Sequence, residues 1–280
     1  MSRQDLSILF FYFLGYSRIR NLVLHLQNKP VTRIVTFHDI LPWTLKQFEA
    51  KLLFLKRSTN VVSFNDFFGD RLSSKRINVV ITFDDGFKSW VTHAIPILKR
   101  LELPATFFVS SGFIGLSKEN ETEFVQSKLF LKSSSHKTTG CLKYEDVRKI
   151  IEEGFTVGGH TINHCNLVDL RDDARIRHEI VEDKKRLEMI TGSNIIYFAY
   201  PYGACCNPRI NLSNILKEAG YRGAVTTLAN FNSVETDPYL LHRELTRAAM
   251  DIYVFKARVS GNGDATIYLK QLARIIQRRR

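Results

Sequence analysis

Residues 77–87, INVVITFDDGF, join a mostly apolar segment directly to two adjacent carboxylates. The first seven of these residues are typical of a strand that is buried on both faces of a sheet. Gly86 marks the turn that ends the strand, so Asp84 and Asp85 are expected at its carboxyl end. Two like charges there repel each other and resist burial, and a cation or a proton-transfer role would offset that cost. On the pair alone, an ordinary Asp-Gly turn is the simpler interpretation.

Short apolar segments of this kind alternate with helical patterns along most of the 280 residues. Repeated strand-then-helix units predict an α/β fold with a mainly parallel sheet, either open or closed into a barrel. No linker rich in Pro, Gly or Ser divides the pattern, so we expect a single domain. The expected strands lie near residues 33–37, 77–83, 104–109, 155–159, 195–200, 222–227 and 240–246, and the expected helices near 45–56, 88–101, 144–153, 172–191 and 209–219.

Three segments fall outside this alternation. Residues 1–30 form an apolar and basic leader, whose apolar run from Leu6 to Tyr16 is too short to span a bilayer as a helix. The leader could lie on a membrane as an interfacial helix or pack on the protein's own surface, and the sequence favours neither. The second segment is an insertion at 111–141 with a short helix near 124–131, and the third is a basic amphipathic helix at 263–280. The main body is expected at 31–262, with the insertion inside it.

Lys and Arg residues number 40 against 28 Asp and Glu, which gives a net charge of +12 at neutral pH. This excess suggests an acidic partner, such as an anionic polymer or a membrane surface. We expect no nucleic-acid partner, because no RNA- or DNA-binding signature accompanies the charge. The four cysteines show no CxxC spacing, which favours a reducing compartment. We therefore expect the protein in the cytoplasm, either free or attached to the inner face of the membrane.

In residues 154–167, GFTVGGHTINHCNL, two histidines lie four positions apart just after an expected strand. This spacing puts His160 and His164 on one side of a helical turn, where both could bind one metal ion. Such a pair alone is more often structural or solvated, so a third ligand is required. Asp85, at another strand end, would complete a two-histidine, one-carboxylate site for zinc or another divalent metal. Asp84 then remains free as a general base for a water molecule.

The segments TFDDGF at 82–87 and GGHTINH at 158–164 resemble the first two motifs of the polysaccharide deacetylases, carbohydrate esterase family 4. A third segment, YFAYPYG at 197–203, resembles the aromatic-proline-glycine motif that forms one wall of the family's groove. The resemblance covers about residues 33–261. It implies a distorted, mainly parallel β/α barrel that hydrolyses N-acetyl groups of amino sugars in a polysaccharide, oligosaccharide or glycolipid. It also implies a divalent metal as cofactor, with Zn²⁺ the first choice.

The resemblance implies a role for each matching residue. Asp84 would be the general base that takes a proton from the attacking water. Thr161 would support the metal ligands without touching the metal. The implied metal ligands are Asp85, His160 and His164, and the implied substrate-binding residues are Tyr200, Pro201 and Tyr202.

One departure from the usual family pattern concerns the residue that tethers the base. Many members begin the third motif with an arginine that holds the catalytic aspartate, but this chain has Ala199 at that place. Arg243, near a late strand end, is the expected substitute, because a guanidinium group could keep Asp84 ionised and aimed. An arginine exposed on a strand edge is nearly as good an explanation of the same residue.

A second departure concerns the general acid. The family's last motif usually supplies a C-terminal histidine, and no histidine follows His242. Instead VTFHDI at 35–40 places His38 and Asp39 after the first expected strand. This arrangement resembles the circularly permuted poly-N-acetylglucosamine deacetylases, and a barrel permits the permutation because its first and last strands are neighbours. His38 would then protonate the leaving amine, with Asp39 in a supporting position.

Two other functions remain compatible with these residues. A catalytically silent carbohydrate-binding relative is suggested by Ala199, although a complete set of one base and three ligands argues against it. A metal-dependent amidase acting on a non-sugar substrate is the other, because a fold and a metal site do not fix the substrate. An N-acetylated glycan is therefore the first expected partner, and an anionic membrane surface is the second.

Overall fold

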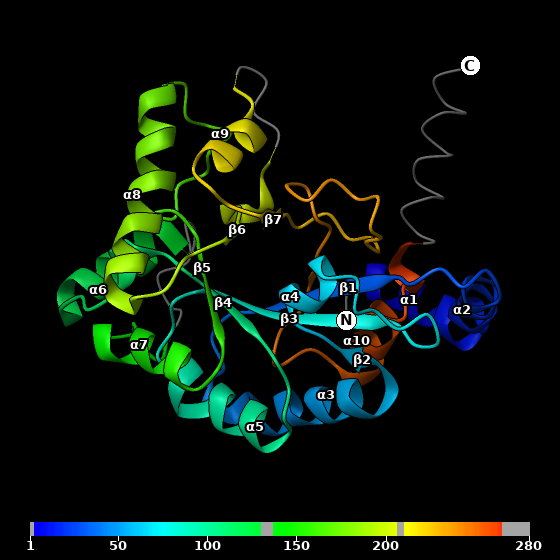
Figure 1. Cartoon of the computed structure of the whole chain (residues 1–280). Helices are drawn as coiled ribbons and strands as arrows, with labels where there is room; N and C mark the ends of the chain where they lie inside the picture. The colour runs from blue at the N-terminus through cyan, green and yellow to red at the C-terminus, as the bar shows by residue number, and fades with distance from the viewer. Residues whose placement is uncertain (1–2, 130–136, 206–209, 265–280) are drawn as a thin grey trace.

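The computed structural model describes residues 3–129, 137–205 and 210–264 of the chain. Its strands are β1 Thr32–Phe37, β2 Asn60–Val61, β3 Asn78–Asp85, β4 Thr106–Val109, β5 Thr156–Gly159, β6 Tyr197–Ala199, β7 Gly223–Val225 and β8 Glu244–Leu245. They follow the order β7-β6-β5-β4-β3-β1-β8, with β2 beside β3, and each of these pairs is parallel. The sheet curls into a distorted barrel with helices around it (Figure 1). The expected mainly parallel β/α barrel is confirmed.

The outer face of the sheet is covered by helices that follow the strands in the chain. Their apolar residues form one core cluster with the outward-facing residues of the strands. The covering helices include α3 Leu45–Ser58, α5 Ile95–Arg100, α7 Tyr144–Glu152 and α8 Asp173–Thr191 (Figure 1). The α-helices are α1 Arg3–Phe13, α2 Tyr16–Leu26, α3 Leu45–Ser58, α4 Phe64–Phe68, α5 Ile95–Arg100, α6 Lys118–Phe124, α7 Tyr144–Glu152, α8 Asp173–Thr191, α9 Leu212–Glu218 and α10 Ile252–Val259.

Alternate residues of each strand point to opposite faces of the sheet, which divides the apolar side chains into two clusters. Val79 and Ile81 of β3 join the cluster under the outer helices. Val80 joins a second cluster inside the barrel, together with Tyr197 of β6 and residues of α4. Because Asp84 lies four residues after Val80 in the same strand, this alternation directs its side chain into the barrel.

The segment before α10 closes the barrel. Val225 of β7 forms a parallel bridge with Leu241. A few residues later, Glu244 and Leu245 of β8 pair with β1. The segment 241–245 therefore spans the gap between β7 and β1, so that the first strand lies beside the last. This is the neighbour relationship that the permuted arrangement requires.

The N-terminal leader forms the helical pair α1 and α2, which is attached to the barrel by ion pairs. Arg258 of α10 contacts Asp5 of α1 at 3.0 Å and Glu244 of β8 at 2.7 Å. Arg20 of α2 contacts Asp264 at 3.2 Å. The leader thus packs on the protein's own surface through one side, while its other side stays exposed. Over the residues described, no helix combines the length and the apolar character needed to cross a bilayer.

Several elements differ from the expectations based on sequence. The insertion forms α6 and a π-helical turn at Val125–Leu129, slightly earlier than the helix expected near 124–131. The short elements β2, α4 and α10 were not expected, because two to eight residues carry little periodic signal. The C-terminal helix expected at 263–280 lies outside the described residues from position 265 onward.

Candidate metal and catalytic site

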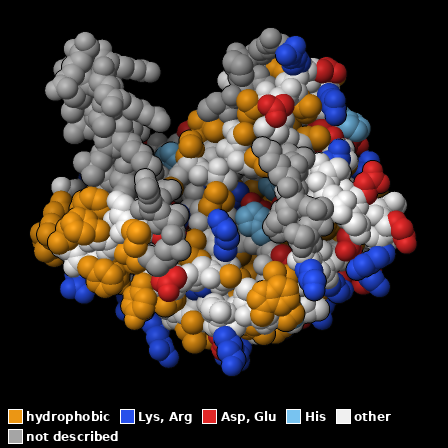
Figure 2. All heavy atoms as spheres, turned by 180° about the vertical axis from the view of Figure 1, so that it is seen from behind, with side chains coloured by type: hydrophobic (Ala, Val, Ile, Leu, Met, Phe, Trp, Pro, Cys, Tyr) orange, Lys and Arg blue, Asp and Glu red, His pale blue; other side chains and the backbone are white. Residues whose placement is uncertain are grey.

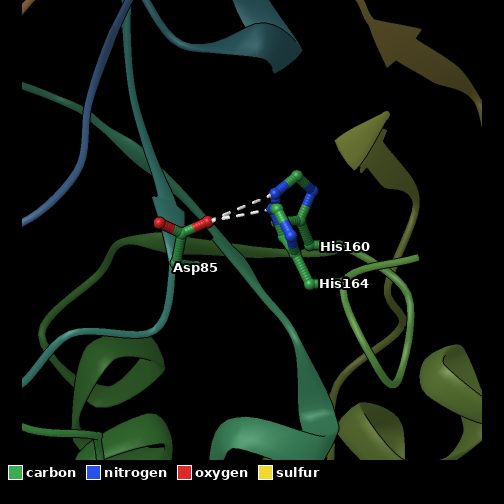
Figure 3. A group of neighbouring side chains, drawn as sticks. All are labelled: Asp85, His160 and His164. Carbon is green, nitrogen blue, oxygen red and sulfur yellow. Dashed lines mark ion pairs between the residues drawn. The ribbon is translucent and has the colours of Figure 1, made fainter. Parts of the chain in front are cut away.

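Three buried side chains meet at the carboxyl ends of β3 and β5 (Figure 3). Asp85 is the last residue of β3, His160 directly follows β5, and His164 lies four residues further along the loop. The Nε2 atoms of His160 and His164 lie 3.5 Å and 3.3 Å from Oδ1 of Asp85. One ligand atom from each residue lies within 4.8 Å of the others. The structure brings together the three residues that the sequence predicts as metal ligands.

Backbone carbonyl groups orient both imidazole rings. Nδ1 of His160 lies 2.7 Å from the carbonyl oxygen of Ala199, and Nδ1 of His164 lies 3.0 Å from that of Lys128. Because a carbonyl oxygen can only accept, Nδ1 carries the hydrogen in each ring, and in a neutral ring the Nε2 lone pair faces Asp85. Lone pairs repel a carboxylate oxygen unless a cation lies between them. This donor set therefore fits a divalent metal.

The pKa values of these groups follow from the same arrangement. Burial raises the pKa of Asp85, but the His160 and His164 rings, which can donate from Nε2 only when protonated, outweigh it and hold this pKa well below its usual value. Burial lowers the pKa of His160, while Asp85 and Asp84 raise it by more, so that the net shift is upward. The protein therefore favours positive charge between the carboxylates and the imidazoles, which is the charge a metal ion would supply.

Asp84 pairs with an arginine inside the barrel, next to the candidate ligands. Nη1 of Arg243 donates to Oδ1 of Asp84 at 2.6 Å, and Nε of Arg243 donates to the carbonyl oxygen of Thr226 at 3.0 Å. Burial raises the pKa of Asp84, yet the charges of Arg243 and of two nearby histidines lower it below its usual value. Arg243 is only 1% exposed, so the alternative interpretation of this residue as an exposed arginine on a strand edge is wrong.

His38 follows β1 on the edge of the barrel where the two carboxylates lie. The charge of His38 lowers the pKa of both Asp84 and Asp85. The backbone carbonyl of His38 accepts a hydrogen bond from Nε1 of Trp90 at 3.0 Å, which fixes the turn after the strand. His38 is partly exposed.

Asp39 and Thr161, the two residues expected in supporting positions, both hold loops in place through hydrogen bonds. The Asp39 carboxylate accepts hydrogen bonds from the hydroxyl groups of Ser89 and Thr139, both at 2.6 Å. Asp39 thereby ties the turn that carries His38 to the end of the insertion. Oγ1 of Thr161 accepts a hydrogen bond from the N–H of Cys165 at 3.1 Å, which braces the loop that contains both histidines.

The three expected groove residues have different environments. Tyr202 is 41% exposed, its ring centroid lies 4.7 Å from that of His164, and its hydroxyl donates to the carbonyl oxygen of Lys128. Pro201 is buried, and Tyr200 is fully buried with its hydroxyl donating to the carbonyl oxygen of Tyr239 at 3.1 Å. Tyr202 is therefore the exposed one of these three residues, and the expectation that Tyr200 and Pro201 bind substrate stays a prediction. Figure 2 shows histidine side chains within a hollow near the middle of one face of the molecule.

Sequence reasoning missed three groups that touch the site. The carbonyl of Lys128, in the insertion, orients His164, and no sequence pattern marks a carbonyl group. Asp183 and Glu179 of α8 accept hydrogen bonds from the backbone N–H groups of His160 and Asn163. Their signal was available, because two acidic residues four positions apart share the buried face of α8.

Comparison with known proteins gives relatives of one kind. Residues 72–224 match the family model for polysaccharide deacetylase. The chain is 30% identical over 146 residues to a chitooligosaccharide deacetylase of Azorhizobium caulinodans, which covers 51% of this chain and 57% of that protein. It is 25% identical over 181 residues to YxkH of Bacillus subtilis, covering 65% and 56% of the two chains. The chain thus spans little more than half the length of these curated relatives.

A solved structure shares the fold. IcaB from Ammonifex degensii is 22% identical, with a TM-score of 0.62 over 84% of this chain and 97% of that chain, a likeness that concerns the fold alone. The family match includes both aspartates and both histidines of the site, whereas His38 and Arg243 lie outside it. Because the match extends over more than half of its residues, this chain belongs to the polysaccharide deacetylase family.

Proposed function

We propose that the protein hydrolyses N-acetyl groups from amino sugars of a glycan with the help of a divalent metal. One observation carries this proposal. Asp84, which Arg243 keeps ionised, lies directly beside a buried cluster whose two histidine Nε2 atoms face the Asp85 carboxylate. A base next to a cation site is what amide hydrolysis by water needs, whereas a protein that only binds a sugar has no use for the base.

Zn²⁺ is the metal that these ligands suit best. Two imidazole nitrogens and one carboxylate oxygen, from His160, His164 and Asp85, leave open positions for water and substrate. When bound there, the metal would act as a Lewis acid toward water and the acetyl carbonyl group. The carbonyl groups of Ala199 and Lys128 keep both imidazole rings aimed at that position.

The chain's own residues divide the proton transfers between them. Asp84 takes a proton from the attacking water, and the Arg243 guanidinium keeps this carboxylate ionised and fixes its direction. His38 donates a proton to the amine nitrogen as the C–N bond breaks, because an imidazolium N–H can act as a general acid. Tyr202 is the aromatic residue of the third motif that remains exposed, so it offers a face against which a pyranose ring can pack.

We propose oligomers of N-acetylglucosamine as the substrate class to test first, because one relative is named as a chitooligosaccharide deacetylase. A silent carbohydrate-binding relative is less well supported, since the Arg243 ion pair supplies the tether that Ala199 lacks. A non-sugar amidase differs only in the substrate, and simple acetamides tested beside the oligomers separate the two functions.

We also propose that the exposed side of α1 and α2 rests on an anionic membrane surface, which would be the inner face if the protein is cytoplasmic. Figure 2 shows hydrophobic side chains gathered at the edge of the molecule that these helices form. No Asp or Glu occurs between Leu6 and Phe37, whereas Arg18 and Lys29 are exposed beside this surface. An apolar face flanked by cations is suited to anionic lipid. Its exposed apolar residues are Leu6, Phe10, Phe13, Leu14, Ile19, Leu22, Val23 and Leu26.

Removal of one metal ligand should abolish both metal binding and activity. We expect His164→Ala to weaken Zn²⁺ binding more than about 100-fold, because loss of an outer partner alone costs roughly 10–100-fold. Acetate release from N-acetylglucosamine oligomers should fall in parallel and should stop in wild-type protein stripped by a chelator, then return with Zn²⁺. His178→Ala, on the exposed side of α8, is the matched control. Normal zinc content in His164→Ala would refute the ligand assignment.

Loss of the arginine tether should be costly for stability as well as for activity. Arg243→Met leaves the Asp84 carboxylate buried without its partner, so we expect a loss of about 3–5 kcal/mol in the free energy of unfolding. Adding Asp84→Asn removes the uncompensated charge and should restore most of that stability, but no activity. Denaturant titrations of both variants measure this. Equal stability of Arg243→Met and wild type would contradict the tether.

Loss of the general acid should slow substrates in proportion to the basicity of their leaving group. We expect His38→Ala to lower turnover of the N-acetyl sugar by roughly 10²–10⁴-fold, while metal content stays unchanged. An aryl acetate ester, whose leaving group needs little protonation, should be much less affected. Steady-state rates on both substrates decide this. If His38→Ala slows the two substrates equally, or leaves the amide rate unchanged, His38 is not the acid.

Binding to anionic vesicles should depend on the apolar side chains of the leader. We expect wild-type protein to pellet with anionic but not neutral vesicles and to dissociate at high salt, since each basic residue contributes on the order of 1 kcal/mol. Replacing Phe10 and Phe13 with Ser should abolish pelleting, whereas Met189→Ser, an exposed apolar residue on α8, should not. Equal, negligible pelleting with both kinds of vesicle would refute the membrane proposal.

A further inference from the structure

The loop that carries both histidine ligands has an unusual backbone. Thr161 and His164 adopt positive φ angles of 61° and 50°, a region that residues with side chains rarely occupy, and a β-branched residue least of all. A loop of this kind keeps such a conformation only where its surroundings hold it. The loop lies against α8, and side chains of that helix bind it.

Two acidic side chains on one face of α8 bind the two ends of this loop. Oδ2 of Asp183 accepts the backbone N–H of His160 at 2.9 Å. Oε2 of Glu179 accepts a hydrogen bond from the backbone N–H of Asn163 at 2.9 Å. Oε1 of Glu179 accepts one from Nδ2 of the Asn163 side chain at 2.7 Å. Residues four apart on a helix lie on one side of it, so both carboxylates can face the loop.

Asp183 also joins the loop to a second strand end. Its other oxygen, Oδ1, accepts the backbone N–H of Ser111, just after β4, at 2.9 Å. A Cβ at Gly159 would lie 3.0 Å from Oδ2 of Asp183, so the glycine before the first ligand leaves room for the carboxylate to approach. One carboxylate therefore fixes the backbone of two neighbouring loops at the carboxyl edge of the sheet.

These two carboxylates accept hydrogen bonds from the loops and form no ion pair at the surface that the structure describes. Asp183 is 0% and Glu179 3% exposed, and the ion pairs found in the described part of the chain include neither of them. Glu182, on the same helix, instead pairs with Lys185 at 2.7 Å near the surface. A buried carboxylate is costly unless it accepts several hydrogen bonds, and here the loop supplies them.

We propose that Asp183 and Glu179 are positioning residues that hold the backbone of His160–His164 in the strained form needed for metal binding. This inference rests on the proposed metal-dependent function. Without the two carboxylates the loop would relax, and metal binding would then have to restore the strained form. The result would be a weaker metal site, even though every ligand is still present.

The near-isosteric variants Asp183→Asn and Glu179→Gln test this directly, because each replaces one accepting oxygen with a donor that faces an N–H group. We expect each to weaken Zn²⁺ binding about 10–100-fold, measured by competition with a chromophoric chelator. In metal-free protein, the amide hydrogens of His160 and Asn163 should exchange faster than in wild type. Activity at saturating Zn²⁺ should return, with the substrate KM unchanged. Glu182→Gln is the matched control and should behave as wild type.

The outcomes separate this inference from the proposed function. If wild type binds Zn²⁺ and both variants bind it within about twofold of wild type, the positioning role is wrong while the function stands. A variant that loses thermal stability equally with and without Zn²⁺, at unchanged zinc affinity, would show a merely structural role and would also overturn it. If Asp183→Asn does not fold, Glu179→Gln decides alone, because it acts at the other end of the loop. Wild-type protein that binds no Zn²⁺ overturns both.

Discussion

Two adjacent carboxylates buried at the end of one strand need two separate sources of positive charge, and the site is arranged around that requirement. Arg243 supplies the charge for Asp84 through an ion pair of 2.6 Å inside the barrel. The charge for Asp85 must come from the side of His160 and His164, whose Nε2 atoms face it. Because the neighbours differ, two chemically identical groups are suited to the different roles proposed for them, one as a base and one as a ligand.

The closure of the barrel makes this division possible. Arg243 lies in the segment that spans the gap between β7 and β1, so a residue late in the chain reaches an aspartate on β3. Ala199, where many relatives carry the tethering arginine, contributes its carbonyl group to His160 instead. His38 reaches the same edge from β1, the other neighbour of the closing segment. In a closed sheet the guanidinium group that pairs with Asp84 can therefore come from different strands in different members of the family.

Much of the barrel and of the candidate metal site could be predicted from sequence, because each depends on short local patterns. The run before Asp84 has the composition of a buried strand, and two histidines just after another strand indicate a shared pair of ligands. The segment between His160 and His164 is a loop with positive φ angles at Thr161 and His164, however, and not the helical turn that their spacing suggests. Other features depend on contacts between distant segments. The burial of Tyr200 follows from strand parity that three residues of β6 do not reveal. The Lys128 carbonyl that orients His164 belongs to the backbone of the insertion, so no residue type could have indicated it.

The central claim is that Asp85, His160 and His164 together bind one metal ion beside Asp84. The most direct measurement is anomalous X-ray scattering at the zinc edge from crystals of the protein soaked with an N-acetylglucosamine oligomer. We expect one strong anomalous peak in contact with Nε2 of both histidines and an oxygen of Asp85, with the sugar's acetyl group next to it. A crystal grown with zinc that shows no peak between these three side chains, or a zinc ion bound elsewhere with this cluster empty, would contradict the claim.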